Sequence, residues 1–264
     1  MKPIKMTLPW FLLAAGVALV SAQDGKVMTA DELFKRNVGT KEQQMKQFPP
    51  YQVIGNIYYV GSEALSSYLI VTREGDILIN SMYEGNVPGI RASVEQLGFK
   101  FTDIKILLGS HAHGDHMEGD ALVKEWSGAR VMAMAEDVPA LERMRPGNKP
   151  HPIDQVLHDG EEVSLGGTTL VAHLTPGHTK GNTTWTTKVT EGGKSYNVAI
   201  IGSMGVNPGF NLVDTKNGPP LAESYLKTFQ VMRSLPCDVP LASHPRCTTW
   251  PQSTPESERA PTHS

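Results

Sequence analysis

The strongest constraint on this chain is one short segment, residues 110–116, which reads Ser-His-Ala-His-Gly-Asp-His. It brings three imidazoles and one carboxylate into six consecutive residues, directly after the apolar run Ile104–Leu108 and one glycine. The apolar run predicts a buried β-strand. Imidazole and carboxylate groups gathered on a loop at a strand end are ligands that suit zinc. Chance is a poor explanation, because the chain has only nine histidines in 264 residues.

Two further histidines also follow apolar runs. His178 lies in the turn-rich segment 175–181, Thr-Pro-Gly-His-Thr-Lys-Gly, and His244 lies near the end of segment 239–245, Val-Pro-Leu-Ala-Ser-His-Pro. The candidate metal ligands are therefore His111, His113, Asp115, His116, His178 and His244. A catalytic zinc takes three protein ligands and a water, so six ligands predict two zinc ions per chain.

The other histidines lack such a pattern, and we do not expect them to bind metal. His173 lies in a predicted strand, which favours a core or supporting role. His151 and His158 lie in or near a Pro/Gly-rich loop and are expected at the rim of the pocket, and His263 lies in the tail.

Composition narrows the class of protein. A hydrophobic content of 39% and a charged content of 19% are typical of a folded globular chain. The formal net charge of -3 gives no reason to expect nucleic acid as a partner. Two cysteines, Cys237 and Cys247, are too few for a disulfide framework or a cysteine-rich zinc site.

The N-terminus has the layout of a secretory signal peptide. Lys2 and Lys5 precede the apolar run Leu8–Val20, and small residues follow up to Ala22. The run is shorter than the roughly 20 residues that cross a bilayer, which argues against a permanent anchor. We predict that residues 1–22 are a signal peptide cleaved after Ala22, that the mature protein is periplasmic, and that it keeps no stable membrane anchor.

Alternation of apolar residues predicts a mixed α/β chain. Expected strands are Tyr51–Val60, Ser66–Thr72, Asp76–Ile79, Ile104–Leu108, Arg130–Met134, Thr168–Leu174, Thr183–Val189, Tyr196–Ile201 and Val239–Ala242. Expected helices are a short one opening near Thr29 and those at Val87–Leu97, Met117–Trp126, Asp137–Met144 and Ala222–Leu235. Residues 41–50 are expected to be a loop, residues 23–247 one domain, and residues 248–264 a disordered tail, because they are polar and without apolar periodicity.

Together, the segments 110–116, 175–181 and 243–245 resemble the motifs of the metallo-β-lactamase superfamily, over about residues 51–245. That resemblance implies a four-layer αβ/βα sandwich with the metal site at the edge between two mixed sheets. Superfamily members with glyoxalase II-like or RNase Z-like activity usually carry a metal-bridging Asp where this chain has Ser203. Together with Thr183-Thr184-Trp185, Ser203 makes the chain resemble the class B, subclass 3 zinc β-lactamases.

The narrower resemblance implies a role for each site residue. His111, His113 and His178 would bind the first zinc, and Asp115, His116 and His244 would bind the second. Asp115 would also be catalytic by orienting the nucleophile, and Ser203 would contact the substrate carboxylate. The implied activity is opening of the β-lactam ring of penicillins, cephalosporins and carbapenems by metal-bound hydroxide, which confers antibiotic resistance.

Two alternatives stay open at this point. One is another superfamily hydrolase, such as a lactonase or a thioesterase or glyoxalase II-like enzyme, and the other is a non-catalytic zinc-binding relative. The family continues beyond the last histidine and carries a cysteine that pairs with the one at Cys237, whereas Cys247 here lies three residues after His244. We therefore expect an atypical end, truncated or frameshifted, and at best a strained Cys237–Cys247 pair.

Overall fold

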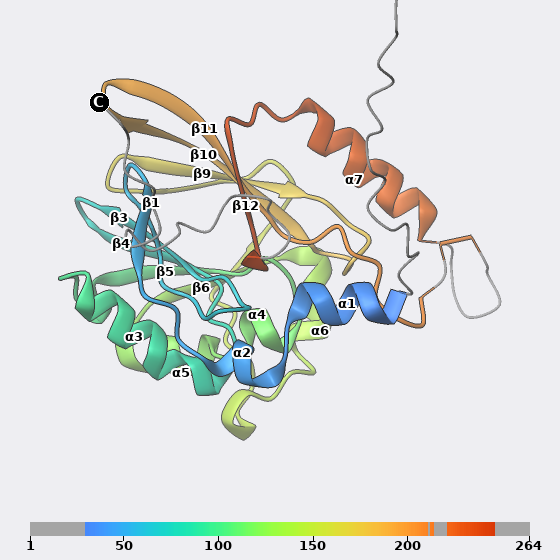
Figure 1. Cartoon of the computed structure of the whole chain (residues 1–264), viewed down its shortest axis with the longest axis horizontal. Helices are drawn as coiled ribbons and strands as arrows, with labels where there is room; N and C mark the ends of the chain where they lie inside the picture. The colour runs from blue at the N-terminus through green and yellow to red at the C-terminus, as the bar shows by residue number, and fades with distance from the viewer. Residues whose placement is uncertain (1–29, 211, 214–220, 246–264) are drawn as a thin grey trace, which may run out of the picture.

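The computed structural model describes residues 30–210, 212–213 and 221–245 (Figure 1). A seven-stranded sheet has the order β1-β2-β3-β4-β5-β6-β7, and a five-stranded sheet has the order β12-β11-β10-β9-β8. The first sheet consists of β1 (Tyr51–Ile54), β2 (Ile57–Tyr59), β3 (Tyr68–Thr72), β4 (Gly75–Ile79), β5 (Ile104–Leu108), β6 (Arg130–Met134) and β7 (Gln155–Leu157). The second consists of β8 (Glu162–Leu165), β9 (Thr168–Leu174), β10 (Thr183–Glu191), β11 (Lys194–Ile201) and β12 (Val239–Ala242).

Both sheets are mixed. Strands β4 to β7 pair in parallel and β1 to β4 pair antiparallel, while β12 is the parallel partner of β11 in an otherwise antiparallel sheet. The α-helices are α1 (Ala30–Val38), α2 (Lys41–Met45), α3 (Val87–Gln96), α4 (Gly114–Met117), α5 (Asp120–Ser127), α6 (Val138–Leu141) and α7 (Ala222–Ser234).

The main core lies between the two sheets, because each strand turns alternate side chains toward the other sheet. On β9, Leu170 and Ala172 are fully buried in this core. On β10, Trp185 is 1% exposed, and its indole Nε1 donates to the carbonyl of Gly109 at 3.1 Å. The backbone N–H of Thr183 likewise donates to Ser110 O at 2.8 Å. The second sheet therefore supports the start of the predicted metal segment directly.

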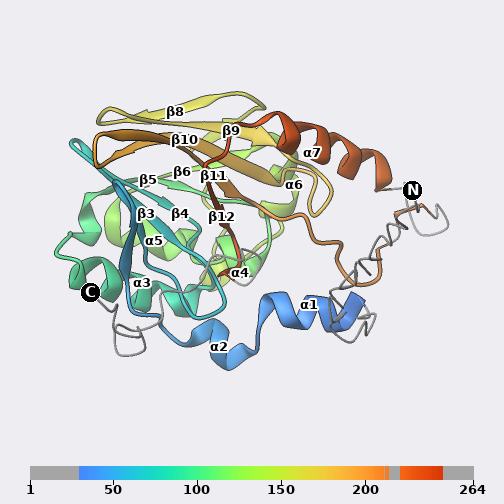
Figure 2. The same cartoon turned by 45° about the horizontal axis from the view of Figure 1, so that its top comes forward.

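Helices α3 and α5 lie on the outer face of the seven-stranded sheet and α7 lies against one end of the five-stranded sheet, which completes four layers (Figure 2). Ile90 and Val94 of α3 and Val123 of α5 are fully buried in a second core with Leu78 and Leu107 of the seven-stranded sheet. On the other side, α7 lies against the five-stranded sheet. The predicted αβ/βα sandwich is thus confirmed.

Several predicted elements differ from those observed. Residues 41–50 are not all loop, because Thr40 and Gln43 form a reciprocal capping box that opens α2. The expected strand Tyr51–Val60 is a hairpin instead, which turns at Gly55 with φ 55°. The expected helix Met117–Trp126 is two helices, α4 and α5, with Gly119 between them.

Two strands were missed, β7 and β8. Both are short, three residues in β7 and four in β8, and each carries only two apolar residues, too few to mark a strand in the sequence. The predicted signal peptide at residues 1–22, the tail at 248–264 and Cys247 lie outside the described residues. Within the described part, none of the helices is both long enough and apolar enough to cross a membrane.

Candidate metal centre

Three separate strand ends meet at one edge of the sandwich. β5 leads into the segment that carries His111 and His113, the β9–β10 loop carries His178, and β12 leads to His244. Figure 1 shows that β12 ends beside α4, the short helix that carries Asp115 and His116. The fold therefore brings six side chains together from positions up to 133 residues apart (244 minus 111).

The six side chains form two compact triads. In the first triad, one ligand atom from each of His111, His113 and His178 lies within 4.8 Å of the others. The second triad groups Asp115, His116 and His244 within the same limit. The triads adjoin, because the ring centroids of His111 and His116 are 4.1 Å apart.

The chemistry of the donor set fits two cations. Nε2 of His111 and both ring nitrogens of His116 are buried without a hydrogen-bond partner among the described residues. An unsatisfied buried polar atom costs about 1–3 kcal/mol, which a coordinated ion would remove. Imidazole nitrogens with one carboxylate, in two sets of three, match zinc at sites that keep a position open for water.

Hydrogen bonds orient two of the imidazoles. Nδ1 of His178 donates to Gly205 O at 2.7 Å, and Nδ1 of His244 donates to Ala64 O at 3.2 Å. In both rings this leaves Nε2 as the lone-pair donor toward the centre. Nε2 of His244 lies 3.5 Å from Asp115 Oδ2, and Nε2 of His116 lies 3.4 Å from the same oxygen.

The environment keeps the ligands in their metal-binding protonation states. Burial lowers the pKa of His116 to about 3 and that of His178 to about 4, so both rings are neutral at physiological pH. Burial alone would raise the pKa of the Asp115 carboxyl, but its position among His116, His244 and His113 and a backbone hydrogen bond bring the net pKa below its usual value. Asp115 is therefore an ionised acceptor between two imidazoles.

Comparison with known proteins identifies the family. A sequence profile described as the metallo-beta-lactamase superfamily matches residues 61–244. The chain belongs to this superfamily. Its domain is a superfamily hydrolase domain, and its structural neighbours include class B3 metallo-β-lactamases.

Solved structures in this superfamily resemble the chain over most of its length. The native FEZ-1 metallo-beta-lactamase from Legionella gormanii is 52% identical, over 75% of this chain and 80% of that one, with a TM-score of 0.71. The class B3 di-zinc enzyme LRA-12 from an Alaskan soil metagenome is 32% identical, over 78% and 82%, with a TM-score of 0.72.

Curated relatives match over shorter stretches. A hydroxyacylglutathione hydrolase from Cereibacter sphaeroides is 31% identical over 93 residues, which are 35% of this chain and 32% of the relative. The corresponding enzyme of Pseudomonas paraeruginosa is 39% identical over 77 residues, 29% of this chain and 25% of the relative. The chain thus spans about a third or less of the length of these curated relatives.

A strained segment at the end of β4 holds both ends of the superfamily's metal-binding segment. Asn80 and Met82 have φ values of 66° and 59°, which non-glycine residues rarely adopt. Oδ1 of Asn80 accepts from the backbone N–H of Ser110 at 2.8 Å, and the N–H of Met82 donates to His116 O at 3.1 Å. Backbone strain of this kind often marks a functional site. No motif in the sequence marks these residues, which directly follow the predicted strand Asp76–Ile79.

Asp137 joins the two loops of the first triad, a role that the sequence analysis also missed. It is 3% exposed, and its Oδ2 accepts from the N–H of Ala112 and the hydroxyl of Thr179, both at 2.8 Å. Its Oδ1 accepts from the N–H of Gly181 at 2.8 Å. A Cβ on Gly181 would lie only 2.6 Å from the backbone nitrogen of Asp137, so a glycine is needed for this close approach. The carboxylate therefore ties the His111–His113 segment to the His178 loop.

The remaining predicted residues lie outside the triads. Ser203 follows β11 and is half-buried, and its Oγ accepts from the N–H of Gly205 at 3.3 Å. The carbonyl of the same Gly205 accepts from His178. His173 is half-buried on the outer face of its sheet, where its Nε2 lies 2.7 Å from Oγ1 of Thr186, so the predicted core or supporting role is not confirmed. His158 is exposed. The rim position predicted for His151 is wrong, because this residue is buried behind α4.

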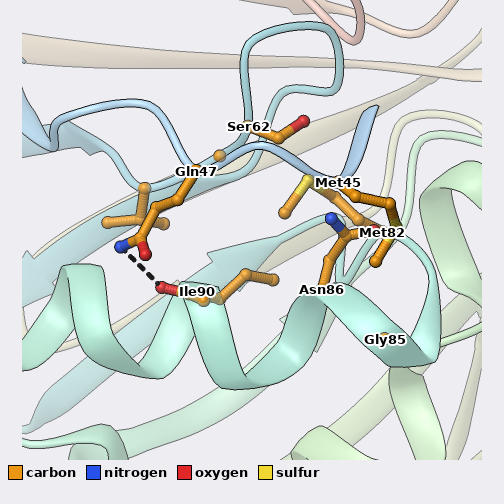
Figure 3. A pocket seen from close by; sticks show the side chains of 10 residues that line it. Met45, Gln47, Ser62, Met82, Gly85, Asn86 and Ile90 are labelled. Carbon is orange, nitrogen blue, oxygen red and sulfur yellow. Dashed lines mark hydrogen bonds between the residues drawn. The ribbon is translucent and has the colours of Figure 1, made fainter. Parts of the chain in front are cut away.

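A small hollow of about 100 Å³ lies between α2 and the start of α3 (Figure 3). Met45, Gln47, Met82, Asn86 and Ile90 are among the residues that line it. None of its lining residues belongs to either triad, so the hollow is separate from the metal ligands.

Proposed function

We propose that this chain is a zinc-dependent β-lactamase of subclass B3 with two zinc ions. The observation that carries the proposal is the 52% identity to FEZ-1 across 80% of that enzyme. The similarity to hydroxyacylglutathione hydrolases is lower and covers about a third of those enzymes. The two triads support the same reading, since each offers three ligands to one ion.

Each of the six candidate ligands has a role in the proposed reaction. His111, His113 and His178 would hold the first zinc, and Asp115, His116 and His244 the second. When bound, zinc supplies a water with a pKa near 7 and a Lewis acid for the carbonyl. The ionised Asp115 carboxylate accepts a hydrogen bond and so orients the attacking water toward the β-lactam carbonyl.

Ser203 would bind the substrate at its carboxylate. Its hydroxyl is half-buried beside the His178 loop and can donate one hydrogen bond. Two residues further, Gly205 has no side chain to add a second donor. The carboxylate contact in this chain therefore depends on a single hydroxyl.

A glyoxalase II-like hydrolase is the second candidate, favoured by the curated relatives. Ser203 argues against it, because a hydroxyl cannot bridge two cations as a carboxylate does. A zinc-binding relative without activity is the third, and it would bind zinc without turning over either substrate.

A comparison of substrates tests the proposal. Purified protein loaded with zinc is expected to hydrolyse nitrocefin and a carbapenem, with kcat/KM at least about a hundredfold above that for S-lactoylglutathione, because substrate contacts differ between the classes. The assay measures absorbance at a fixed zinc concentration, with zinc-loaded serum albumin as the control. A higher kcat/KM for S-lactoylglutathione than for the β-lactams would establish the glyoxalase II-like hydrolase instead. Zinc binding with no turnover of any of these substrates would establish the inactive zinc-binding relative.

We further propose that the chain is exported to the periplasm, where its small-molecule β-lactam partners arrive first. Lys2, Lys5 and the apolar run up to Val20 support export. Protein recovered from the periplasmic fraction of expressing cells is expected to have the intact mass of a chain that begins at Gln23. Full-length protein confined to the cytoplasm would contradict this.

A further inference from the structure

Three buried polar side chains form a group behind α4 that does not belong to either triad. Asp120, at the start of α5, is 1% exposed, Ser81 is fully buried, and the side chain of His151 is fully buried. Oδ1 of Asp120 accepts from the Ser81 hydroxyl at 2.6 Å, and its Oδ2 lies 3.1 Å from Nε2 of His151. A buried carboxylate is costly unless its partners are well placed, so the group has a strongly preferred geometry.

This group contacts the C-terminal end of α4. Nε2 of His151 also lies 3.1 Å from the carbonyl of Met117. Ser81 Oγ lies 3.3 Å from His116 O, and the adjacent residue Met82 donates its N–H to the same carbonyl at 3.1 Å. The Met117 carbonyl is therefore held from behind by His151 and the His116 carbonyl by the N–H of Met82, since the single hydroxyl proton of Ser81 goes to Asp120.

The connection between α4 and α5 is closely packed at Gly119. A Cβ on Gly119 would lie 2.8 Å from Ser81 O and 2.7 Å from Val87 Cγ2, so the chain between α4 and α5 passes directly against Ser81. Because α4 has only four residues, a shift of its last carbonyls moves Asp115 and His116 with it.

We propose that Ser81, Asp120 and His151 are positioning residues for the second metal ion. His151 holds the carbonyl of Met117, and Asp120 fixes both His151 and Ser81, whose neighbour Met82 holds the carbonyl of His116, so that together they set the direction in which α4 presents Asp115 and His116. The inference rests on the proposed two-metal site and deepens it. The first triad has other supports, since Asn80 holds Ser110, and Asp137 holds Ala112 and the His178 loop. The effect of the group is therefore confined to one of the two ions.

Zinc affinity at each site tests this assignment. In Asp120→Asn and His151→Phe, titration against a chromophoric chelator is expected to show the second zinc bound about 10–100-fold more weakly, as for other residues that orient metal ligands. The first zinc is expected to keep its affinity. His151→Gln, which retains an N–H for Met117 O, is expected to recover part of the loss. Asp137→Asn is the matched comparison, a buried carboxylate whose loss is expected to weaken the first site instead.

A double variant separates positioning from general destabilisation. If Asp120 acts through the second site, Asp115→Asn already removes that ion, so Asp115→Asn/Asp120→Asn loses no further zinc affinity. A fall of both affinities together, or a lower melting temperature with unchanged zinc binding, would overturn the proposal. Should Asp120→Asn not fold, the His151 pair gives the same comparison. Wild-type protein that binds fewer than two zinc ions would refute the two-metal site itself, and the inference with it.

Discussion

Removal of zinc is expected to abolish β-lactam hydrolysis completely, and addition of two equivalents to restore it. The site concentrates five imidazoles and one carboxylate, and three of its buried ring nitrogens have no hydrogen-bond partner among the described residues. No side chain in the triads supplies a nucleophile of its own, so turnover depends on the bound ions. The measurement is the nitrocefin rate after dialysis against a chelator and then after zinc is added back, with metal content determined in parallel.

The same preparation gives a second readout that does not depend on turnover. If zinc binds the folded chain as proposed, the melting temperature of the protein is expected to rise with zinc, by an amount equivalent to about 2.7 kcal/mol at a concentration 100 times the Kd. Magnesium, which prefers oxygen ligands, serves as the control and is expected to change neither property. Full activity in protein shown by metal analysis to be zinc-free would exclude the proposed mechanism.

Asp115→Asn is expected to lower kcat for nitrocefin by at least about a hundredfold and to remove one zinc ion per chain. Asp115 is the one carboxylate among the six ligands, and its Oδ2 lies 3.4 and 3.5 Å from Nε2 of His116 and His244. Asparagine keeps the shape of the side chain but loses the charge, which weakens both the metal bond and the orientation of the attacking water. Steady-state kinetics and metal counting on the same samples measure the two effects.

Asp103→Asn is the matched control for this variant. Asp103 is an exposed carboxylate ahead of β5 on the same chain segment, so its loss is expected to leave both the rate and the zinc content unchanged. If Asp115→Asn kept the wild-type rate with two zinc ions bound, Asp115 would be neither a ligand nor a catalytic residue.

The metal ligands were predictable from the sequence because metal binding needs particular side chains in close spacing. The segment 110–116 alone showed three imidazoles and a carboxylate, and the apolar runs before His178 and His244 showed that these also lie at strand ends. The family resemblance implied that the site lies at the edge of the sandwich, and the structure brings the six side chains together there. The positions of β5, β6, β9 and β12 follow from the same apolar patterns.

The supporting residues were not predictable in this way. Asp137 looked only like the start of a short helix, and Asp120 like one polar residue in a longer one. Their partners, such as Gly181 and His151, are 44 and 31 residues away along the chain, and no local pattern links them. His151 was misplaced for the same reason, because a lone histidine in a Pro/Gly-rich loop does not reveal whether the loop folds inward.

The amino-acid sequence by itself determined which groups are the candidate metal ligands, since these depend on residue type and spacing along the chain, and its motifs resemble a family whose fold the structure confirms. The tertiary structure decided what brings the two groups of three side chains together and what holds each of them, and it agrees with the division that the family resemblance implied. That division depends on distances between β5, β10 and β12, on the strained turn at Asn80 and Met82, and on two buried carboxylates. These are contacts between distant segments, and they exist only after the two sheets have packed against each other.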